Sequence, residues 1–141
     1  MDLGMNAVPP PAIRYADGNC FTVTDMIGLF RRVHPNRAGD DSTEDVEQMF
    51  AHANLTATAW MDSLLVGFAR AFTDFHFVAY LADLAVDSGW QRRGIGRGLI
   101  RRVMARLAPG AKLVLLSTPE ANGFYLSLGC RPHPHGWMII K

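Results

Sequence analysis

The chain has 141 residues, of which 49% are apolar and 19% carry a charge, and this suits one globular domain with a sizeable core. Its formal net charge of +1 argues against dominant attraction to nucleic acid or to a membrane surface, and no apolar run approaches the length of a membrane span. Residues 1–11 include three consecutive prolines and lack the regions of a secretory signal. We expect them to form a loose tail ahead of a single domain over residues 12–141.

In chain order, the first half changes from helical to alternating hydrophobic periodicity. A short strand over Ala12–Tyr15 precedes apolar residues at helical spacing over Thr22–Val33, where Thr24 is the expected N-cap, and over Thr43–Ala53. Alternating apolar residues then predict three further strands joined by tight turns. These strands cover Leu55–Met61, Leu64–Phe72 and His76–Val86.

The second half begins with a glycine-rich loop after Val86, which leads into a helix that runs to Leu107 and ends at Pro109-Gly110. The remaining pattern predicts a buried strand, a short helix and a final strand, with no internal repeat. These three elements cover Lys112–Ser117, Ala121–Leu128 and Gly136–Lys141. The expected order is therefore strand, two helices, three strands, helix, strand, helix, strand.

The glycine-rich loop predicts an anion-binding site at the start of the helix that follows it. Gly94 and Gly96 lack the Cβ atoms that would keep phosphate groups away from the backbone. The first N–H groups of a helix have no intrahelical acceptors, and the helix dipole adds partial positive charge to them. Further donors and charges stand around this point on Gln91, Arg92, Arg93 and Arg97.

Other interpretations of these glycines compete with a phosphate site. They could serve only the close packing of a helix on a strand. A dinucleotide-binding turn would also follow a strand, with Glu120 as its downstream acid, but Leu99 stands where the third glycine belongs. Too little chain follows Glu120 to complete a doubly wound sheet. A nucleoside-triphosphate loop is excluded because the chain contains no G-x-x-x-x-G-K-[ST].

Two motifs resemble those of the GCN5-related N-acetyltransferases (GNAT). The run Gln91-Arg92-Arg93-Gly94-Ile95-Gly96 fully matches the signature Q/R-x-x-G-x-G/A of their acyl-CoA pyrophosphate loop. Asn122–Cys130 is similar to their N-x-x-[FL]-Y-x-x-x-G-F element, with Cys130 in place of the usual aromatic residue. The likeness runs from Ile13 onward and includes small bacterial and plastid-type serotonin (arylalkylamine) N-acetyltransferases. It implies an α/β (α+β) GNAT fold, in which a mixed, mostly antiparallel sheet has helices on both faces and a splay between its fourth and fifth strands.

The resemblance implies acetyl-CoA as cosubstrate, without a metal. Its pantetheine would enter the splay and pair with strand backbone. Tyr125 would protonate the leaving thiolate as general acid, although a half-buried aromatic on a short helix is the plainer interpretation. Asn122 would contact the cofactor or cap the helix. The implied cofactor-binding residues are Leu84, Ala85, Val86, Gln91, Arg92, Arg93, Gly94, Ile95, Gly96, Arg97, Asn122 and Tyr125.

Asp83 has two competing roles because it is an acid inside an otherwise apolar strand, where an unpaired charge is costly. It could accept the proton of the amine as general base, and it aligns with an acid in the serotonin-acetyltransferase-like relatives. Equally, it could pair with Arg70 on the neighbouring strand. His76 and Tyr80 are weaker candidates for the base, on the same strand but on its opposite face.

These features predict an acetyl-CoA-dependent N-acetyltransferase that transfers the acetyl group directly to a small primary amine in a ternary complex. A protein lysine or N-terminus is the alternative acceptor, and a non-catalytic acyl-CoA sensor is a third interpretation. Cys20 and Cys130 have neither metal nor redox spacing, so we expect a reducing compartment, the cytoplasm. We interpret His133-Pro134-His135 as a turn and not a metal site, and the sequence allows a homodimer.

Overall fold

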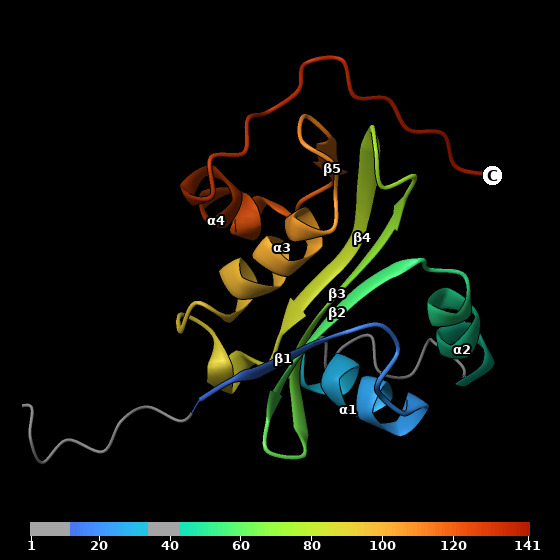
Figure 1. The fold of residues 1–141 in the computed structure, drawn as a ribbon, viewed down its shortest axis with the longest axis vertical. Helices are drawn as coiled ribbons and strands as arrows, with labels where there is room; N and C mark the ends of the chain where they lie inside the picture. The colour runs from blue at the N-terminus through green and yellow to red at the C-terminus, as the bar shows by residue number, and fades with distance from the viewer. Residues whose placement is uncertain (1–11, 34–42) are drawn as a thin grey trace, which may run out of the picture.

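The computed structural model describes residues 12–33 and 43–141 and shows a mixed five-stranded sheet in the order β1-β2-β3-β4-β5 (Figure 1). The first four strands are antiparallel to their neighbours and β5 is parallel to β4, which confirms the predicted mostly antiparallel sheet. The expected tail over residues 1–11 and the loop over residues 34–42 lie outside the described residues. The strands are β1 Arg14–Asp17, β2 Leu55–Met61, β3 Leu64–Thr73, β4 Val78–Val86 and β5 Lys112–Leu115.

Helices cover both faces of the sheet, as predicted, because each presents one apolar stripe. One cluster of buried side chains joins the sheet to α3, and a second joins the opposite face to α1 and α2. The helices are α1 Val23–Val33, α2 Thr43–Ala51, α3 Ile95–Ala105 and α4 Asn122–Ser127, with short 3-10 helices at Ser88–Trp90 and Pro119–Ala121. The buried residues that α3 contributes are Ile95, Leu99, Ile100 and Val103. Those of α1 and α2 are Met26, Leu29, Val46 and Phe50.

One extra residue in β4 changes which side chains share a face. Arg70 of β3 pairs with Asp83, whereas the next residue, Ala71, pairs with Leu81, so Ala82 has no partner and forms a β-bulge. The alternation of β4 is therefore displaced by one residue at this point. In consequence Leu81 and Leu84 both pack on the α3 side of the sheet, although they stand three residues apart.

The bulge makes the predicted placement of Tyr80 wrong. Tyr80 pairs with Phe72, which lies two residues from Arg70 on β3 and so shares its face. Tyr80 and Asp83 consequently lie on the same face of the sheet, not on opposite faces. His76 precedes β4 and is exposed in the turn before it.

The predicted splay between the fourth and fifth strands is confirmed. The pairing of β4 with β5 covers only Val78 to Leu81, opposite Lys112 to Leu115. Among the described residues, the rest of β4 to Val86 is paired with β3 alone. The second half of β4 therefore presents an unpaired backbone edge where β5 has diverged.

Two local predictions are corrected. The cap of α1 is Thr22 and not Thr24, because the Thr22 hydroxyl accepts a bond from the backbone N–H of Asp25 at 3.0 Å. The Asp25 carboxylate accepts the N–H of Thr22 in return at 2.9 Å. The helix expected to reach Leu107 ends at Ala105.

The final strand expected over Gly136–Lys141 does not form. This segment is exposed throughout, with Trp137 at 94% and Ile139 at 96%, and it makes no hydrogen bond to the described residues. A strand exists only through its pairing, so apolar alternation without a bonded neighbour leaves the segment extended and unpaired. Of the helices in residues 12–33 and 43–141, none is long and apolar enough to cross a membrane.

Candidate active site

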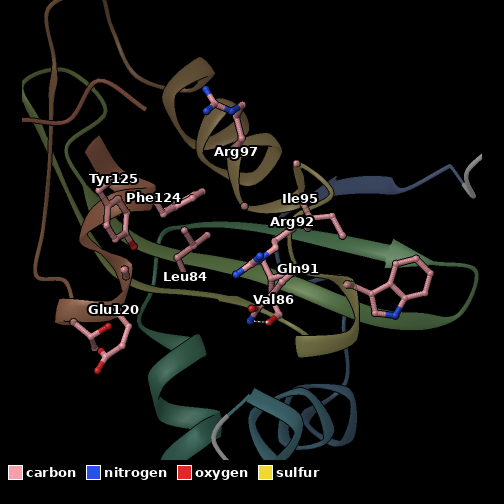
Figure 2. A pocket seen from close by; sticks show the side chains of 14 residues that line it. Leu84, Val86, Gln91, Arg92, Ile95, Arg97, Glu120, Phe124 and Tyr125 are labelled. Atoms are coloured by element: carbon pink, nitrogen blue, oxygen red, sulfur yellow. Dashed lines mark hydrogen bonds between the residues drawn. The ribbon is translucent and has the colours of Figure 1, made fainter. Parts of the chain in front are cut away.

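A cavity of about 750 Å³ opens where β4 has left β5, between the end of β4, the start of α3 and α4 (Figure 2). Most of the predicted cofactor-binding residues line it. These are Leu84, Val86, Gln91, Arg92, Gly94, Ile95, Gly96, Arg97 and Tyr125. The strand end and the glycine-rich loop thus meet in one space, as their order in the sequence predicts.

Two glycines shape the wall at the start of α3. Gly94 precedes the helix in the left-handed region, with φ at +82°, and a Cβ on it would point into open space. A Cβ on Gly96 would come within 3.0 Å of the Phe124 ring, so a larger residue here would push α4 away from α3. Because α3 begins at the cavity, its free first-turn N–H groups and positive dipole end suit an anion there.

Some side chains of the glycine-rich loop line the cavity, and others contact neighbouring residues of the protein. The Gln91 amide donates to the carbonyl of Val86 at 3.1 Å and closes the loop on the end of β4 (Figure 2). Arg92 lines the cavity with its backbone in the left-handed region at φ +62°. Arg93 instead stacks on the ring of Trp90, with 4.8 Å from guanidinium carbon to ring centroid, and is absent from the lining.

An ion pair that sequence analysis missed holds the entry to this loop. Asp87, almost buried, accepts the N–H of Gly89 at 2.9 Å and the Nε–H of Arg32 on α1 at 2.5 Å. Arg32 also donates to the carbonyl of Leu65 at 2.7 Å, and the N–H of Asp87 donates to Val66 at 2.8 Å. Together these bonds tie α1, β3 and the loop. An acid between an apolar strand and a Ser-Gly pair was the available signal, since such residues cap turns.

Tyr125 reaches the cavity from α4 and points toward Leu84 of β4 in Figure 2. Burial raises the pKa of its phenol above 10.0, and the neighbouring Cys130 raises the pKa further. The hydroxyl therefore keeps its proton at neutral and mildly alkaline pH. This is the state that a proton donor needs.

Ala85 and Asn122, both predicted to bind the cofactor, lie outside the lining. Ala85 is buried on the opposite face, in the cluster under α1 and α2. The side-chain amide oxygen of Asn122 accepts a hydrogen bond from the Ser117 hydroxyl at 2.5 Å. This bond joins the segment after β5 to the start of α4. The Asn122 side chain does not cap α4, because Asn122 is already the first residue of that helix.

Asp83 forms the ion pair that the sequence left as one alternative. Its carboxylate accepts the Nε–H of Arg70 at 2.6 Å, and Arg70 also donates to the carbonyl of Met49 on α2 at 3.3 Å. Asp83 does not line the cavity. The segment after β5 supplies three lining residues that the sequence analysis did not assign to the cofactor site, and the position of this segment at the splay was the missed signal. They are Thr118, Glu120 and Ala121, and Trp90 and Phe124 complete the lining.

Glu120 is the one carboxylate in the lining of this cavity. Its side chain and that of Tyr125 extend from the same short stretch of chain (Figure 2). Within the described part of the chain, no three His, Cys, Asp or Glu side chains lie close enough to hold a metal ion. The site therefore combines a helix start that suits an anion, a retained phenolic proton and one acidic group.

Residues 52–131 match the family model described as an acetyltransferase (GNAT) domain. The chain belongs to the GNAT acetyltransferases. Among curated relatives, the histone acetyltransferase TAP1 of Glycine max is 34% identical over 74 residues, which cover 51% of this chain and 32% of that protein. The chloroplastic GCN5-related N-acetyltransferase 1 of Arabidopsis thaliana is 36% identical over 73 residues, 50% of this chain and 37% of that protein. Each match spans less than half of the relative's own length.

Solved GNAT structures share the fold across nearly the whole chain. A GNAT family acetyltransferase from Streptococcus pneumoniae superposes with a TM-score of 0.75 at 23% identity, covering 92% of this chain and 98% of that one. The aminoglycoside N-acetyltransferase AAC(6')-Iy in complex with CoA gives a TM-score of 0.70 at 20% identity, covering 96% and 99%. At these identities the matches show a common fold.

We predict that Arg32→Met lowers the free energy of unfolding by about 1–3 kcal/mol, because it leaves the buried Asp87 carboxylate without its charged donor. Arg102→Met is the matched control. Arg102 also donates through its Nε atom, to Asp17 at 3.1 Å, but the side chains of Arg102 and Asp17 are 40% and 41% exposed. Exposed pairs contribute about 0–1 kcal/mol. Urea unfolding measures both variants, and equal losses would contradict the role of the Arg32–Asp87 pair.

Proposed function

We propose that this protein is an acetyl-CoA-dependent N-acetyltransferase that acetylates a primary amine of a small molecule by direct transfer in a ternary complex. The observation that carries the proposal is the cavity at the splay, where the start of α3 and the Tyr125 phenol face one space. Membership of the GNAT acetyltransferases supports the proposed acetyl transfer. A neighbour of the same fold is a complex with CoA, which supports the cosubstrate.

The residues around the cavity fit an acyl-CoA. The open space beside Gly94 and the free N–H groups of α3 suit its pyrophosphate, and the Arg92 and Arg97 side chains add positive charge in the lining. Among the described residues no strand pairs with β4 on the β5 side at Leu84 and Val86. The Val86 carbonyl already accepts the Gln91 amide, which leaves the backbone groups of Leu84 available to a pantetheine amide. The bound cosubstrate supplies an activated acetyl thioester.

Three kinds of group in the chain then act on the reaction: the Tyr125 phenol, the backbone N–H groups of β4 and the Glu120 carboxylate. The amine attacks the thioester carbon in its neutral form, after it has lost a proton to water. Tyr125 holds a proton at its hydroxyl and is placed to give it to the departing sulfur as the carbon–sulfur bond breaks, and the proton that the new amide nitrogen loses returns through water to the phenolate. Backbone N–H groups of the unpaired β4 edge can stabilise the negative charge that develops on the carbonyl oxygen, and the loss of such a donor raises the barrier by about 2.7–4 kcal/mol in other enzymes. Glu120 attracts a cationic amine to the cavity because opposite charges favour encounter.

The acceptor is proposed on chemical grounds. A small amine is supported by Glu120 in the lining and by the aminoglycoside N-acetyltransferases among proteins of the same fold. A protein amine is the second candidate, because one curated relative is named a histone acetyltransferase. Another relative is named chloroplastic, so the cytoplasmic location expected from the sequence stays a prediction.

The activity is tested by the release of free CoA thiol from acetyl-CoA across a panel of small amines and lysine peptides. We expect thiol release with small amines, and about 2.7 kcal/mol of added stability at an acetyl-CoA concentration 100 times its Kd. Gly94→Asp should abolish both effects, since it puts a carboxylate where the phosphates belong. Gly110→Asp is the control, because Gly110 has nearly the same φ, +84°, and the same open surroundings outside the cavity. No stabilisation of the unsubstituted protein would overturn the proposal, as would equal affinity for acetyl-CoA in the two variants.

Tyr125→Phe should lower kcat by about 10²–10⁴ with little change in acetyl-CoA affinity, the range expected when a general acid is lost. Tyr80→Phe is its control, an exposed tyrosine on β4 outside the cavity. Steady-state kinetics and isothermal titration separate turnover from binding. An unchanged kcat would show that the thiolate departs without assistance and that Tyr125 serves packing.

Two isosteric carboxylate variants distinguish attraction of the amine from structural pairing. Glu120→Gln should raise the KM of a cationic amine and leave the KM of acetyl-CoA unchanged. Asp83→Asn should lower the melting temperature and leave kcat unchanged at every pH, because it breaks the Arg70 pair. If Asp83 is instead the general base, the variant loses turnover, and raising the pH partly restores it by supplying neutral amine. That result would reassign Asp83 to catalysis.

A further inference from the structure

Charge is divided unequally between the two parts of the chain that meet at Asp87. Residues 88–141 contain nine of the 14 lysines and arginines but only one of the 13 acidic residues, Glu120. The formal net charge of +1 therefore combines an acidic first part with a strongly basic second part. The basic part forms α3, β5 and α4, and the start of α3 and α4 are walls of the cavity. Asymmetry of this kind indicates a surface for an anionic partner.

Much of this positive charge lies on the outside of α3. The helix packs on the sheet through its four buried apolar residues, so its opposite face points to solvent. Arg97 and Arg101 are one turn apart on that face, and the exposed Arg106 is the C-cap residue. We call these three residues the α3 arginines. Arg102 differs from them because it pairs with Asp17 of β1, whereas no carboxylate among the described residues pairs with an α3 arginine.

The α3 arginines extend beyond the part of the cavity that suits a pyrophosphate. A helix rises about 1.5 Å per residue, so Arg101 lies about 9 Å and Arg106 about 16 Å along the axis from Ile95 at the cavity. Arg97 stands at the rim, and Figure 2 shows its side chain directed away from Leu84. A ligand that contacts all three arginines therefore has an anionic surface attached to the group that enters the cavity.

We propose that this surface binds an acidic carrier protein that presents an acyl group on a phosphopantetheine arm. The arm has the same thiol-bearing end as CoA, so it suits the unpaired β4 edge at Leu84, and its phosphodiester suits the start of α3. An acidic helix of the carrier then lies along the α3 arginines, where opposite charges steer the encounter. The inference rests on the proposed acetyl transfer and extends the donor from CoA to a thioester held by a protein.

The reaction balances with this donor as it does with acetyl-CoA. A neutral amine forms the carbon–nitrogen bond, the carbon–sulfur bond of the arm breaks, and Tyr125 gives its proton to the leaving sulfur. The proton that the new amide nitrogen loses returns through water to the phenolate. The carrier leaves with a free thiol on its arm, so no further reactant is needed.

Three observations favour a protein over a nucleic acid on this surface. Nucleic acids stack bases on exposed aromatic rings, but the ring beside Arg106, Phe75, is half-buried, with the guanidinium carbon 5.7 Å from its centroid. Met104, 40% exposed, lies one turn after Arg101 on the outer face, and protein interfaces are enriched in methionine and arginine. The acidic first part of the chain would also repel a long polyanion that continued past α3.

Isothermal titration with a bacterial acyl carrier protein, with and without its phosphopantetheine arm, tests the surface directly. We expect the form with the arm to bind more tightly, because only that form enters the cavity. Arg101→Glu should weaken binding about tenfold, and the milder pair Arg101→Gln and Arg106→Gln should weaken it in the same direction. Arg31→Glu is the matched control, an exposed arginine of α1 on the opposite face of the sheet, and should bind as the unsubstituted protein does.

Circular dichroism checks that each of these variants is folded. Absence of carrier binding would overturn the proposal. Equal affinity for the two forms of the carrier, or equal losses in Arg101→Glu and Arg31→Glu, would overturn it as well. So would a mixed-sequence RNA that binds more tightly than the carrier and is lost in Arg101→Glu, because that result assigns the surface to nucleic acid.

Turnover with two donors separates this inference from the proposed function. With the same small amine, Arg101→Glu should raise the KM of the acetylated carrier about tenfold and leave the KM of acetyl-CoA unchanged. Thiol release from acetyl-CoA but not from the acetylated carrier would overturn the carrier as donor and leave the proposed function intact. Release from neither donor would contradict the proposed function, and the titration would then decide by itself whether the surface binds the carrier.

Discussion

Two parallel strands stay together only while each offers its hydrogen-bonding edge to the other, and β4 withdraws its edge after Leu81. The bulge at Ala82 stands at this point, and bulges bend a strand and increase its twist. An unpaired backbone edge inside a protein is costly unless it meets another partner. The cavity between β4 and α4 gives that edge access to a ligand, so the feature that weakens the sheet also creates the site.

The cavity keeps its shape because the elements around it are tied across the sheet. Arg32 extends from α1 to the Asp87 carboxylate at the start of the glycine-rich loop, on the side where α3 begins. On the far wall, Arg97 of α3 donates to the carbonyl of Ser127 at 3.4 Å, which links α3 to α4. The helix that covers one face therefore helps to position the loop on the other. Such coupling gives a loop rich in glycine a defined position in spite of its conformational freedom.

Two backbone edges of the sheet lack a strand partner among the described residues: the end of β4 beyond Leu81 and the outer edge of β5. The free edge at the end of β4 is short, and it lines the cavity at Leu84 and Val86. At β5 the free edge is apolar and faces solvent, next to a segment that has no partner of its own. Edges of this kind attract further strands.

The sequence by itself determined the local features of this protein. Glycines at 94 and 96 specify the loop and helix start, and apolar spacing specified α1, α2 and α3 to within a few residues, because short-range sterics and periodic burial act within one segment. The Gln91–Gly96 motif also predicted a wall of the cavity, which all of its residues but Arg93 line.

Only the tertiary structure decided the features that depend on distant partners. The bulge at Ala82, which moved Tyr80 to the face of Asp83, arises from the register between β3 and β4, and strict alternation within one strand cannot reveal it. The partner of Asp87 lies 55 residues away on α1. The segment from Gly136 has the composition of a strand, yet whether it becomes one depends on which edge is free to receive it, because a strand is defined by its neighbour.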